Sequence, residues 1–146
     1  MGLNTTLTYK NWTLAASGHG SLGNYIYNNV ASDGEMLADL WTNSFTSNRL
    51  ESALWSNFNQ ACYLSDYYIK DASFFKVDNV TLGYTFPSLF KSAKLDRALG
   101  LNIYATVQNV ATITNYEGLD PEVFSGIDNN LYPRPRTYIL GVKFNF

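Results

Sequence analysis

The last ten residues of the chain constrain its fold more than any other stretch. In residues 137–146 every second side chain is large and apolar. These side chains are Tyr138, Leu140, Val142, Phe144 and Phe146. A period of two residues is typical of a β-strand with one apolar side, and about 9–11 residues suffice for a tilted strand to cross a bilayer. The segment therefore predicts a strand of membrane-spanning length.

Four further segments alternate in a similar way. Together with the last one they predict strands at about residues 3–9, 12–25, 72–86, 99–110 and 137–146. The first two are joined by a very tight turn at Lys10-Asn11, which favours an antiparallel hairpin. The sequence thus indicates an all-β, antiparallel arrangement of about five strands.

The connections between these strands alternate in length. The short ones are Lys10-Asn11 and Pro87 to about Ala98, and the long ones are about Ile26 to Asp71 and Ala111 to Arg136. A transmembrane barrel has short turns on the periplasmic side and longer loops outside. A soluble sandwich has no general reason to collect its long loops at one end, although some do so for binding. The alternation therefore favours a barrel.

The two faces of the predicted strands differ in polarity. One face is rich in Tyr, Phe, Leu and Val, and the other carries Asn, Gln, Thr and Lys. This division suits a wall with a wet lumen and a lipid-facing exterior, with aromatic rings at the two interfaces. Near the strand ends lie Tyr84, Phe86, Tyr138, Phe144 and Phe146. A soluble sheet whose apolar face is its core has the same periodicity, so the pattern alone leaves both arrangements open.

Composition argues against several classes of protein. Aromatic residues make up 16% of the chain and charged residues 15%, against about 25% charged residues in typical soluble domains. A net charge of -2 provides no basic field for a nucleic-acid backbone. The single cysteine, Cys62, cannot form an internal disulfide. The N-terminus lacks the features of a signal peptide, and no apolar stretch approaches the ~18 residues of a transmembrane helix. A membrane would have to be crossed by strands.

Three stretches of the chain carry longer patterns. Residues 71–87 are DASFFKVDNVTLGYTFP, residues 108–109 and 115–122 are QN and NYEGLDPE, and residues 132–137 are YPRPRT. In this order they resemble the SF…N-x-T-L-G-Y-x-x-P, G-Q-N-L…Y-x-G-x-D-P-E and Y-P-x-P-R-T segments of the SusC/RagA family of TonB-linked outer-membrane proteins. Val107 stands where the family has a glycine. Residues 9–11 and 20–28 are similar to the hairpin that precedes these segments in the family.

The resemblance implies both a fold and a function. The fold would be the last five or so strands of a large transmembrane β-barrel of about 22 strands, with long extracellular loops. The function would be TonB-dependent, non-enzymatic uptake of glycans or peptides across the outer membrane of Bacteroidota, with a SusD-like lipoprotein as the lid. No cofactor is expected, and nucleic acid is not expected as a partner.

The N-terminal parts of the family are absent from this sequence: the signal peptide, the TonB box, the plug domain and most of the barrel. TonB would therefore act through the missing N-terminal part. An open sheet in lipid leaves two edges unpaired, and each unsatisfied backbone group costs several kcal/mol. We expect that the chain does not insert alone and needs the remaining barrel and plug. It would be one part of a split or truncated transporter, or a fragment of a longer reading frame.

The closing strand suggests an additional role in assembly. A terminal Phe146 preceded by alternating apolar residues is similar to the C-terminal signal that the barrel-assembly machinery recognises. We hypothesise that the five apolar residues of this strand, from Tyr138 to Phe146, form that signal.

Catalytic chemistry has little support in the sequence. Residues 18–23 are GHGSLG and formally match a dinucleotide fingerprint, but residues 24–29 favour strand and turn instead of the required helix. His19 is the only histidine, and neither a nucleophile elbow nor a metalloprotease motif is present. We expect no catalytic residue.

Acidic residues gather in the last long loop. They are Glu117, Asp120, Glu122 and Asp128. Carboxylates at such spacing could bind calcium or act as a glycosidase pair, but the alternating ligands and closing Glu of a calcium loop are missing. Asp120-Pro121 favours a turn. We expect no metal site.

Aromatic side chains of the loops are better candidates for binding, because flat rings stack on sugars and anchor protein interfaces. We expect contacts to substrate or lid from exposed Trp41, Trp55, Tyr63, Tyr67, Tyr68, Tyr116 and Tyr132. The alternative is that these rings pack the loops against each other.

Two rival functions remain open. The chain could be a soluble or surface β-sandwich that binds carbohydrate, which would purify without detergent. It could also be a hydrolase that uses the acidic loop, in which case turnover would disappear when Asp120 or Glu122 becomes its amide.

Overall fold

The computed structural model describes residues 1–36, 50–58, 60, 62–90, 99–129 and 132–145 of the 146-residue chain. The chain divides into two compact units. The sheet unit comprises Met1–Ser21, Phe75–Ile113 and Arg134–Phe146. The loop unit comprises Leu22–Phe74 and Thr114–Pro133.

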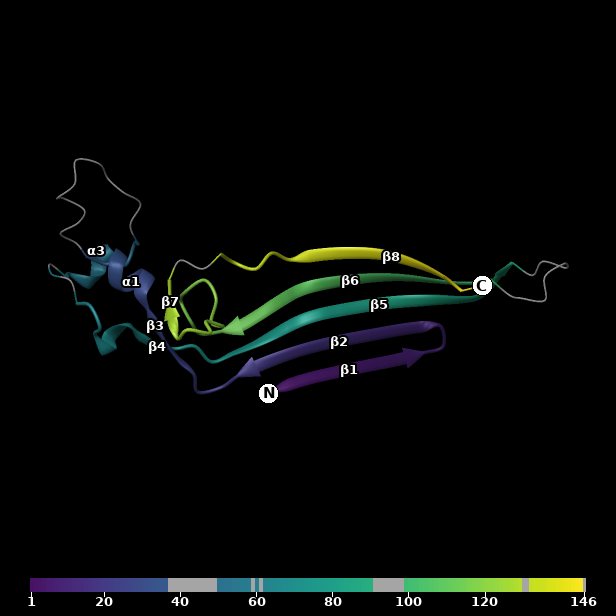
Figure 1. The fold of residues 1–146 in the computed structure, drawn as a ribbon, viewed down its shortest axis with the longest axis horizontal. Helices are drawn as coiled ribbons and strands as arrows, with labels where there is room; N and C mark the ends of the chain where they lie inside the picture. The colour runs from purple at the N-terminus through teal and green to yellow at the C-terminus, as the bar shows by residue number, and fades with distance from the viewer. Residues whose placement is uncertain (37–49, 59, 61, 91–98, 130–131, 146) are drawn as a thin grey trace, which may run out of the picture. The chain divides into compact units, whose positions relative to one another are not determined.

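A five-stranded sheet forms the sheet unit. Its strands are β1 (Gly2–Tyr9), β2 (Trp12–Ser21), β5 (Phe74–Phe90), β6 (Leu99–Thr114) and β8 (Thr137–Asn145). They lie in the order β1-β2-β5-β6-β8, and neighbouring strands run in opposite directions (Figure 1). The expectation of about five antiparallel strands is therefore confirmed, although the chain also contains a few short helices.

The registers of the sheet place apolar residues opposite apolar residues. Between β6 and β8, Val107 pairs with Tyr138 and Ile103 with Val142, whereas Asn102 pairs with Lys143 on the other face. Between β1 and β2, apolar Leu7 likewise faces Leu14, and Thr8 faces Thr13. Because a slip of one residue would exchange the two faces of a strand, these pairings fix which face is apolar.

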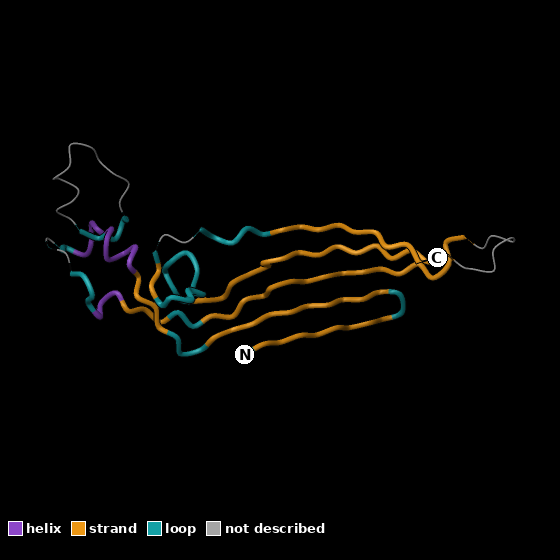
Figure 2. The backbone as a smooth tube through the Cα atoms, viewed as in Figure 1, coloured by secondary structure: helices purple, strands orange, loops and turns teal. Residues whose placement is uncertain are grey.

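The loop unit contains short elements that the sequence reasoning did not anticipate. They are β3 (Tyr25–Asn28), α1 (Asn29–Gly34), α3 (Ala53–Ser56), the 3-10 helix η1 (Asp66–Tyr68), β4 (Ile69–Asp71) and β7 (Ile127–Asp128). The three strands form a small sheet in the order β4-β3-β7, antiparallel between β3 and β4 and parallel between β3 and β7. All helical turns of the described residues lie in the connection between β2 and β5 (Figure 2). None of these helices is long and apolar enough to cross a membrane.

The second strand ends earlier than expected. We predicted a strand over residues 12–25, but β2 ends at Ser21 and a separate strand begins at Tyr25. Gly23 lies between them with a φ of 74°, a backbone conformation that a regular strand does not contain and that glycine adopts without strain. This glycine separates the large sheet from the small one.

Candidate functional site

The apolar face of the large sheet is exposed. Leu140 is 84% exposed and Tyr138 is 71% exposed, and Leu7 and Val142 are also among the exposed residues. The buried hydrophobic residues of the described chain all belong to the loop unit: Ile26, Ala31, Ala53, Tyr68, Ala72, Phe74 and Tyr116. A large contiguous apolar face marks a surface that meets a partner or a membrane.

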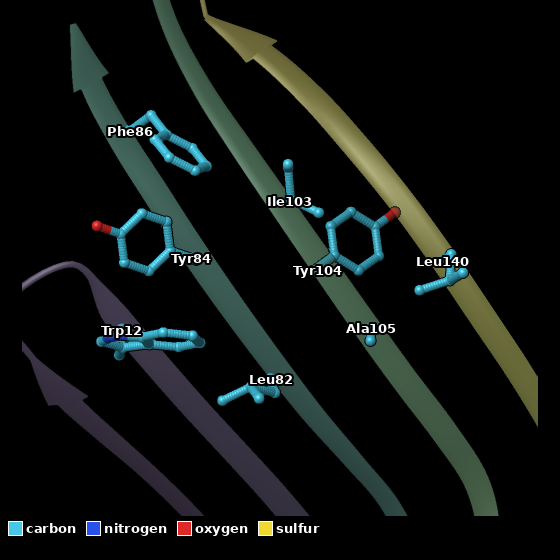
Figure 3. Close-up of a pocket in the computed structure, with 8 residues that line it drawn as sticks. All are labelled: Trp12, Leu82, Tyr84, Phe86, Ile103, Tyr104, Ala105 and Leu140. Carbon is cyan, nitrogen blue, oxygen red and sulfur yellow. The ribbon is translucent and has the colours of Figure 1, made fainter. Parts of the chain in front are cut away.

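A shallow hollow lies on this face of the sheet (Figure 3). Its volume is about 550 Å3, and the side chains of the apolar face that line it are Trp12, Leu82, Tyr84, Phe86, Ile103, Ala105 and Leu140. The rings of Trp12 and Tyr84 meet edge to face at 4.7 Å between centroids, and those of Tyr84 and Phe86 at 4.5 Å. Trp12 follows the Lys10-Asn11 turn directly, so this aromatic group lies at one end of the strands, where a barrel carries its aromatic girdle.

Polar side chains bind to one another on the opposite face. Thr81 and Thr106 share a hydrogen bond of 2.8 Å between their hydroxyl oxygens, and Asn102 Nδ2 donates to Thr85 Oγ1 at 2.7 Å. On the same face the Tyr104 ring lies across Gly141, where a Cβ atom would overlap with it. The sheet thus has one hydrogen-bonding face and one apolar face.

Two of the longer patterns described from the sequence meet at Asn109. Its φ is 53°, a left-handed conformation that asparagine tolerates better than most residues. Its Nδ2 donates to the carbonyl oxygen of Arg134 at 2.6 Å, and Arg136 Nε donates to the carbonyl oxygen of Asn109 at 3.4 Å. The QN pair at residues 108–109 is therefore tied to the YPRPRT stretch that leads into β8.

The DASF stretch ties the loop unit together. Ala72 is fully buried and its N–H donates to the carbonyl oxygen of Asn24. Ser73 Oγ accepts from the Gly23 N–H at 2.9 Å, and the Ser73 carbonyl oxygen accepts from Thr114 Oγ1 at 2.9 Å. Ser73 therefore binds residues of both chain segments that make up the loop unit. Sequence reasoning treated this stretch only as part of a pattern.

Asp71 closes the turn that presents Ser73. Its Oδ1 accepts from the Ser73 N–H at 2.7 Å. Hydrogen bonds from the hydroxyl and the N–H of Ser73 hold the pKa of the Asp71 carboxyl below its usual value, because they favour the charged form. The turn is therefore best formed when Asp71 is ionised.

Tyr116 and Asp128 form a buried pair in the loop unit, next to Gly118. The Tyr116 hydroxyl donates to Asp128 Oδ2 at 2.8 Å. The pKa of Tyr116 is raised mainly by burial, and further by this hydrogen bond and the negative charge of Asp128. The phenol therefore keeps the proton that it donates. A Cβ atom at residue 118 would overlap with the Tyr116 ring and Asp128, which gives a physical reason for the glycine in the NYEGLDPE stretch.

The acidic residues of the last long loop do not gather into a metal site. Asp120 Oδ1 accepts from the Glu122 N–H at 2.9 Å, as in the turn expected at Asp120-Pro121. No group of three His, Cys, Asp or Glu side chains in the described parts of the chain could hold a metal ion. Asp128 differs from the other three acidic residues, because it is fully buried and accepts a hydrogen bond from the Tyr116 hydroxyl.

The loop aromatics divide into exposed and buried rings. Trp55, Tyr63, Tyr67 and Tyr132 are exposed, as expected. The expected exposure of Tyr68 and Tyr116 is wrong, because they are only 2% and 6% exposed. Tyr68 lies in an aromatic group with Tyr27, Phe58 and Tyr67 at centroid distances of 6.2, 6.5 and 5.1 Å. Burial, and to a smaller extent the negative charge of Glu35, raises the pKa of the Tyr68 hydroxyl to about 12. Trp41 lies outside the described residues.

The remaining candidates, which are the glycine-rich stretch and the assembly signal, lie in strands of the large sheet. Residues 18–21 belong to β2, and His19 Nδ1 lies 2.8 Å from Asp78 Oδ2 within the sheet unit. Four residues of the proposed assembly signal, Tyr138, Leu140, Val142 and Phe144, are exposed along β8, and Phe146 lies outside the described residues. Sequence reasoning missed Glu35, whose burial depends on the fold of the loop unit.

The chain is similar in sequence to TonB-dependent receptors. It is 42% identical to TonB-dependent receptor SusC of Bacteroides thetaiotaomicron over 100% of its own length and 15% of the relative's. It is 27% identical to a TonB-dependent receptor of Formosa agariphila over 100% of its length and 16% of the relative's. The chain thus spans about one sixth of these relatives. No protein-family model matches it.

Two solved structures are similar in fold to this chain. The RagAB peptide importer in its open-open state aligns with a TM-score of 0.76 at 22% identity, over 99% of this chain and 17% of that chain. Its closed-closed state aligns with a TM-score of 0.74 over 95% of this chain and 16% of that chain. These proteins are named as receptors and importers, which agrees with the expectation of a non-enzymatic protein.

Proposed function

We propose, from the premise that this chain belongs to the SusC/RagA family of TonB-dependent receptors, that it forms a C-terminal part of the wall and outer loops of an outer-membrane transporter. The sheet unit supplies wall strands, and the loop unit supplies two of the outer connections. In this proposal, TonB acts through the N-terminal part of the transporter.

The observation that carries this proposal is the exposed apolar face of the sheet. Its opposite face is polar and internally hydrogen-bonded, so the two faces suit two different surroundings. In a barrel, lipid contacts the apolar face and the water-filled lumen contacts the polar face. The aromatic group at Trp12, Tyr84 and Phe86 then lies at the membrane interface on the side of the short turns.

The cargo we propose is a glycan or a peptide, received under a SusD-like lipoprotein lid. Support for this class comes from the relatives, one named SusC and another described as a peptide importer. Among the described loop aromatics, Trp55, Tyr67 and Tyr132 are exposed and able to stack on a sugar ring or anchor the lid. Tyr68 and Tyr116 support the loop unit from inside and are not proposed as contacts.

The assembly signal remains part of the proposal. Tyr138, Leu140, Val142 and Phe144 present a continuous apolar row on an outermost strand of the sheet. With Phe146 after them, they fit a strand that the barrel-assembly machinery could recognise. Removal of Phe146 from the complete receptor is expected to lower the amount assembled in the outer membrane, and normal assembly would contradict this role.

The alternative is a soluble or surface β-sandwich that binds carbohydrate. A sandwich buries the apolar face of one sheet against that of another. The exposure of Leu140 and Tyr138 disagrees with a sandwich, because in a sandwich these side chains would be covered by a second sheet.

The test compares the chain alone with the chain joined to the upstream part of the receptor. Gel mobility in detergent with and without heating reports a folded barrel, because a folded barrel migrates differently before it is boiled. We expect a heat-sensitive band in outer membranes only for the joined protein. A monodisperse, detergent-free fold of the chain alone would overturn the proposal and favour the sandwich.

A further inference from the structure

The hollow on the apolar face of the large sheet is lined from four neighbouring strands, β2, β5, β6 and β8 (Figure 3). Its volume of about 550 Å3 lies within the roughly 300–1,000 Å3 that is usual for small-molecule sites. Leu82, Ala105 and Leu140 form its aliphatic part. These side chains have no group that forms hydrogen bonds, so the hollow favours a hydrocarbon chain over a polar ligand.

Lys10 places a positive charge beside the aromatic end of the hollow. Tyr9 of β1 pairs directly with Trp12 of β2, so both rings project from the same face of the sheet. The Lys10 ammonium lies 5.4 Å from the centre of the Tyr9 ring, which is itself exposed. The charge is therefore next to the side chains of the apolar face, although Lys10 belongs to the turn.

The negative charge nearest in the sheet lies at the far end of the strands. Asp78 is the only acidic residue among the described residues of the sheet unit. It contacts His19, which pairs with Gly2 at the opposite end of β1 from Tyr9. A negatively charged group that approaches the short-turn end from outside therefore meets no described carboxylate that would repel it.

An anionic phospholipid combines the two chemical groups that these features favour. Its acyl chain suits the hollow, and its phosphate suits the ammonium of Lys10. In a barrel the short turns lie on the periplasmic side, and the periplasmic leaflet of an outer membrane consists of glycerophospholipids. A protein partner of this face would have to accept both the hydrocarbon-lined hollow and a lysine at its edge, whereas a lipid does so with one molecule.

We propose that the hollow holds one acyl chain of a phosphatidylglycerol molecule whose phosphate pairs with Lys10. The inference rests on the proposed function, which places lipid against this face, and adds a defined lipid site to it. The lipid would stay with the receptor on purification, unlike the lipids around it.

The test uses the complete receptor that contains this segment, purified in detergent, stripped of lipid and checked for heat-modifiable mobility. Native mass spectrometry measures how much receptor carries one added dioleoyl phosphatidylglycerol, and dioleoylglycerol is the probe without a phosphate. Lys10→Gln removes the charge, and Ala105→Phe fills the hollow with a side chain that points toward lipid.

Each variant has a matched control. Lys143→Gln removes a lysine of the polar face, because Lys143 pairs with Asn102, and Asn102 binds Thr85 at the level of Asn11. Ala16→Phe adds a ring to the apolar face outside the hollow, since Ala16 follows Trp12 by four positions in the same strand but is not a lining residue.

We expect one phosphatidylglycerol to bind the wild-type receptor more tightly than dioleoylglycerol. Lys10→Gln should weaken phosphatidylglycerol binding about fivefold, the usual effect of one lysine at an anionic membrane surface, and leave dioleoylglycerol binding unchanged. Ala105→Phe should weaken both lipids about tenfold, as the loss of about two buried CH2 groups would. Both control variants should bind like the wild type.

Equal binding of the two lipids overturns the proposal, and so does unchanged binding in either Lys10→Gln or Ala105→Phe. A change of oligomeric state in Ala105→Phe without a change in lipid binding would make a second receptor the occupant and also overturn it. If the heat-modifiable barrel forms and transports, such results concern the lipid site alone. A receptor that forms no barrel would overturn the proposed function and the lipid site with it.

Discussion

In the sheet unit the apolar side chains of β8 face outward, whereas in the loop unit Ile26, Ala72 and Tyr116 are packed into a core of their own. The apolar side chains of β8 are not buried within the described chain, so this face of the sheet depends on surroundings that accept apolar surface. The loop unit buries some of its rings and aliphatic groups by itself. The difference teaches that one chain can combine a region that buries apolar residues of its own with a sheet whose apolar face remains exposed for other surroundings.

The largest effect is expected from Tyr68→Ala, which tests whether the loop unit depends on its own core. Tyr68 is 2% exposed and packs against Tyr27, Phe58 and Tyr67. Truncation of a buried aromatic side chain commonly costs about 3–5 kcal/mol. In the complete receptor we expect faster amide exchange in the loop unit and unchanged exchange in the large sheet.

The neighbouring Tyr67→Ala is the control for this experiment. Tyr67 is 49% exposed, so its truncation should alter exchange much less. Equal effects of the two substitutions would show that the loop unit has no internal core in the assembled receptor.

The next effect concerns the two faces of the sheet. Leu140 lies on the apolar face and Ile139, which pairs with Thr106, lies on the polar face. A lysine that faces the middle of a bilayer from a barrel strand costs about 2–4 kcal/mol, and one that faces the lumen costs little. Leu140→Lys should therefore lower the unfolding free energy of the receptor in lipid far more than Ile139→Lys. The opposite order in urea titrations would reverse the assignment of the faces.

A smaller effect is expected at Asn109, where β6 is tied to the stretch before β8. Asn109→Ala removes the donor to the Arg134 carbonyl and places a Cβ-bearing residue without a polar group at a φ of 53°. The left-handed conformation costs about 1–2 kcal/mol for most L-residues. Asn109→Gly also removes the donor but avoids this cost, so its thermal midpoint should lie between those of the wild type and the alanine variant.

The smallest effect is a pH dependence in the loop unit. The pKa of Asp71 is below its ordinary value of 3.8 because Ser73 donates to its carboxylate. The stabilisation of the turn is therefore present above the unfolded pKa and is lost as the pH falls through the lower, folded pKa. Amide exchange at Ser73, corrected for its intrinsic rate, should increase in that acidic range. In Asp71→Asn this pH dependence should disappear.

The sequence predicted the large sheet well because alternation is a local property. Leu140, Val142 and Phe144 occur at every second position of one short segment, and no distant residue is needed to recognise the strand. The Asp120-Pro121 turn was predictable for the same reason, since Asp120 binds the N–H of a residue two positions later.

The loop unit was not predictable in this way because its contacts join distant residues. Ser73 binds Gly23 and Thr114, which are 50 and 41 positions away. In the sequence, Tyr116 looks like an exposed aromatic residue of a loop. In the structure it is buried, and its hydroxyl donates a hydrogen bond to Asp128 of the small sheet. Glu35 gave no local sign of its burial for the same reason.

The outermost positions of β1 and β8 in the large sheet have a consequence for how cells can produce this segment. Each strand has one described neighbour, and its other side offers a row of N–H and C=O groups to any extended chain. Such a row does not distinguish the proper next strand of a receptor from a second copy of the same segment. Synthesis of the segment apart from its neighbours would therefore favour chains that add to each other edge to edge. Productive folding becomes a matter of timing, because the proper strand has to arrive before another copy does.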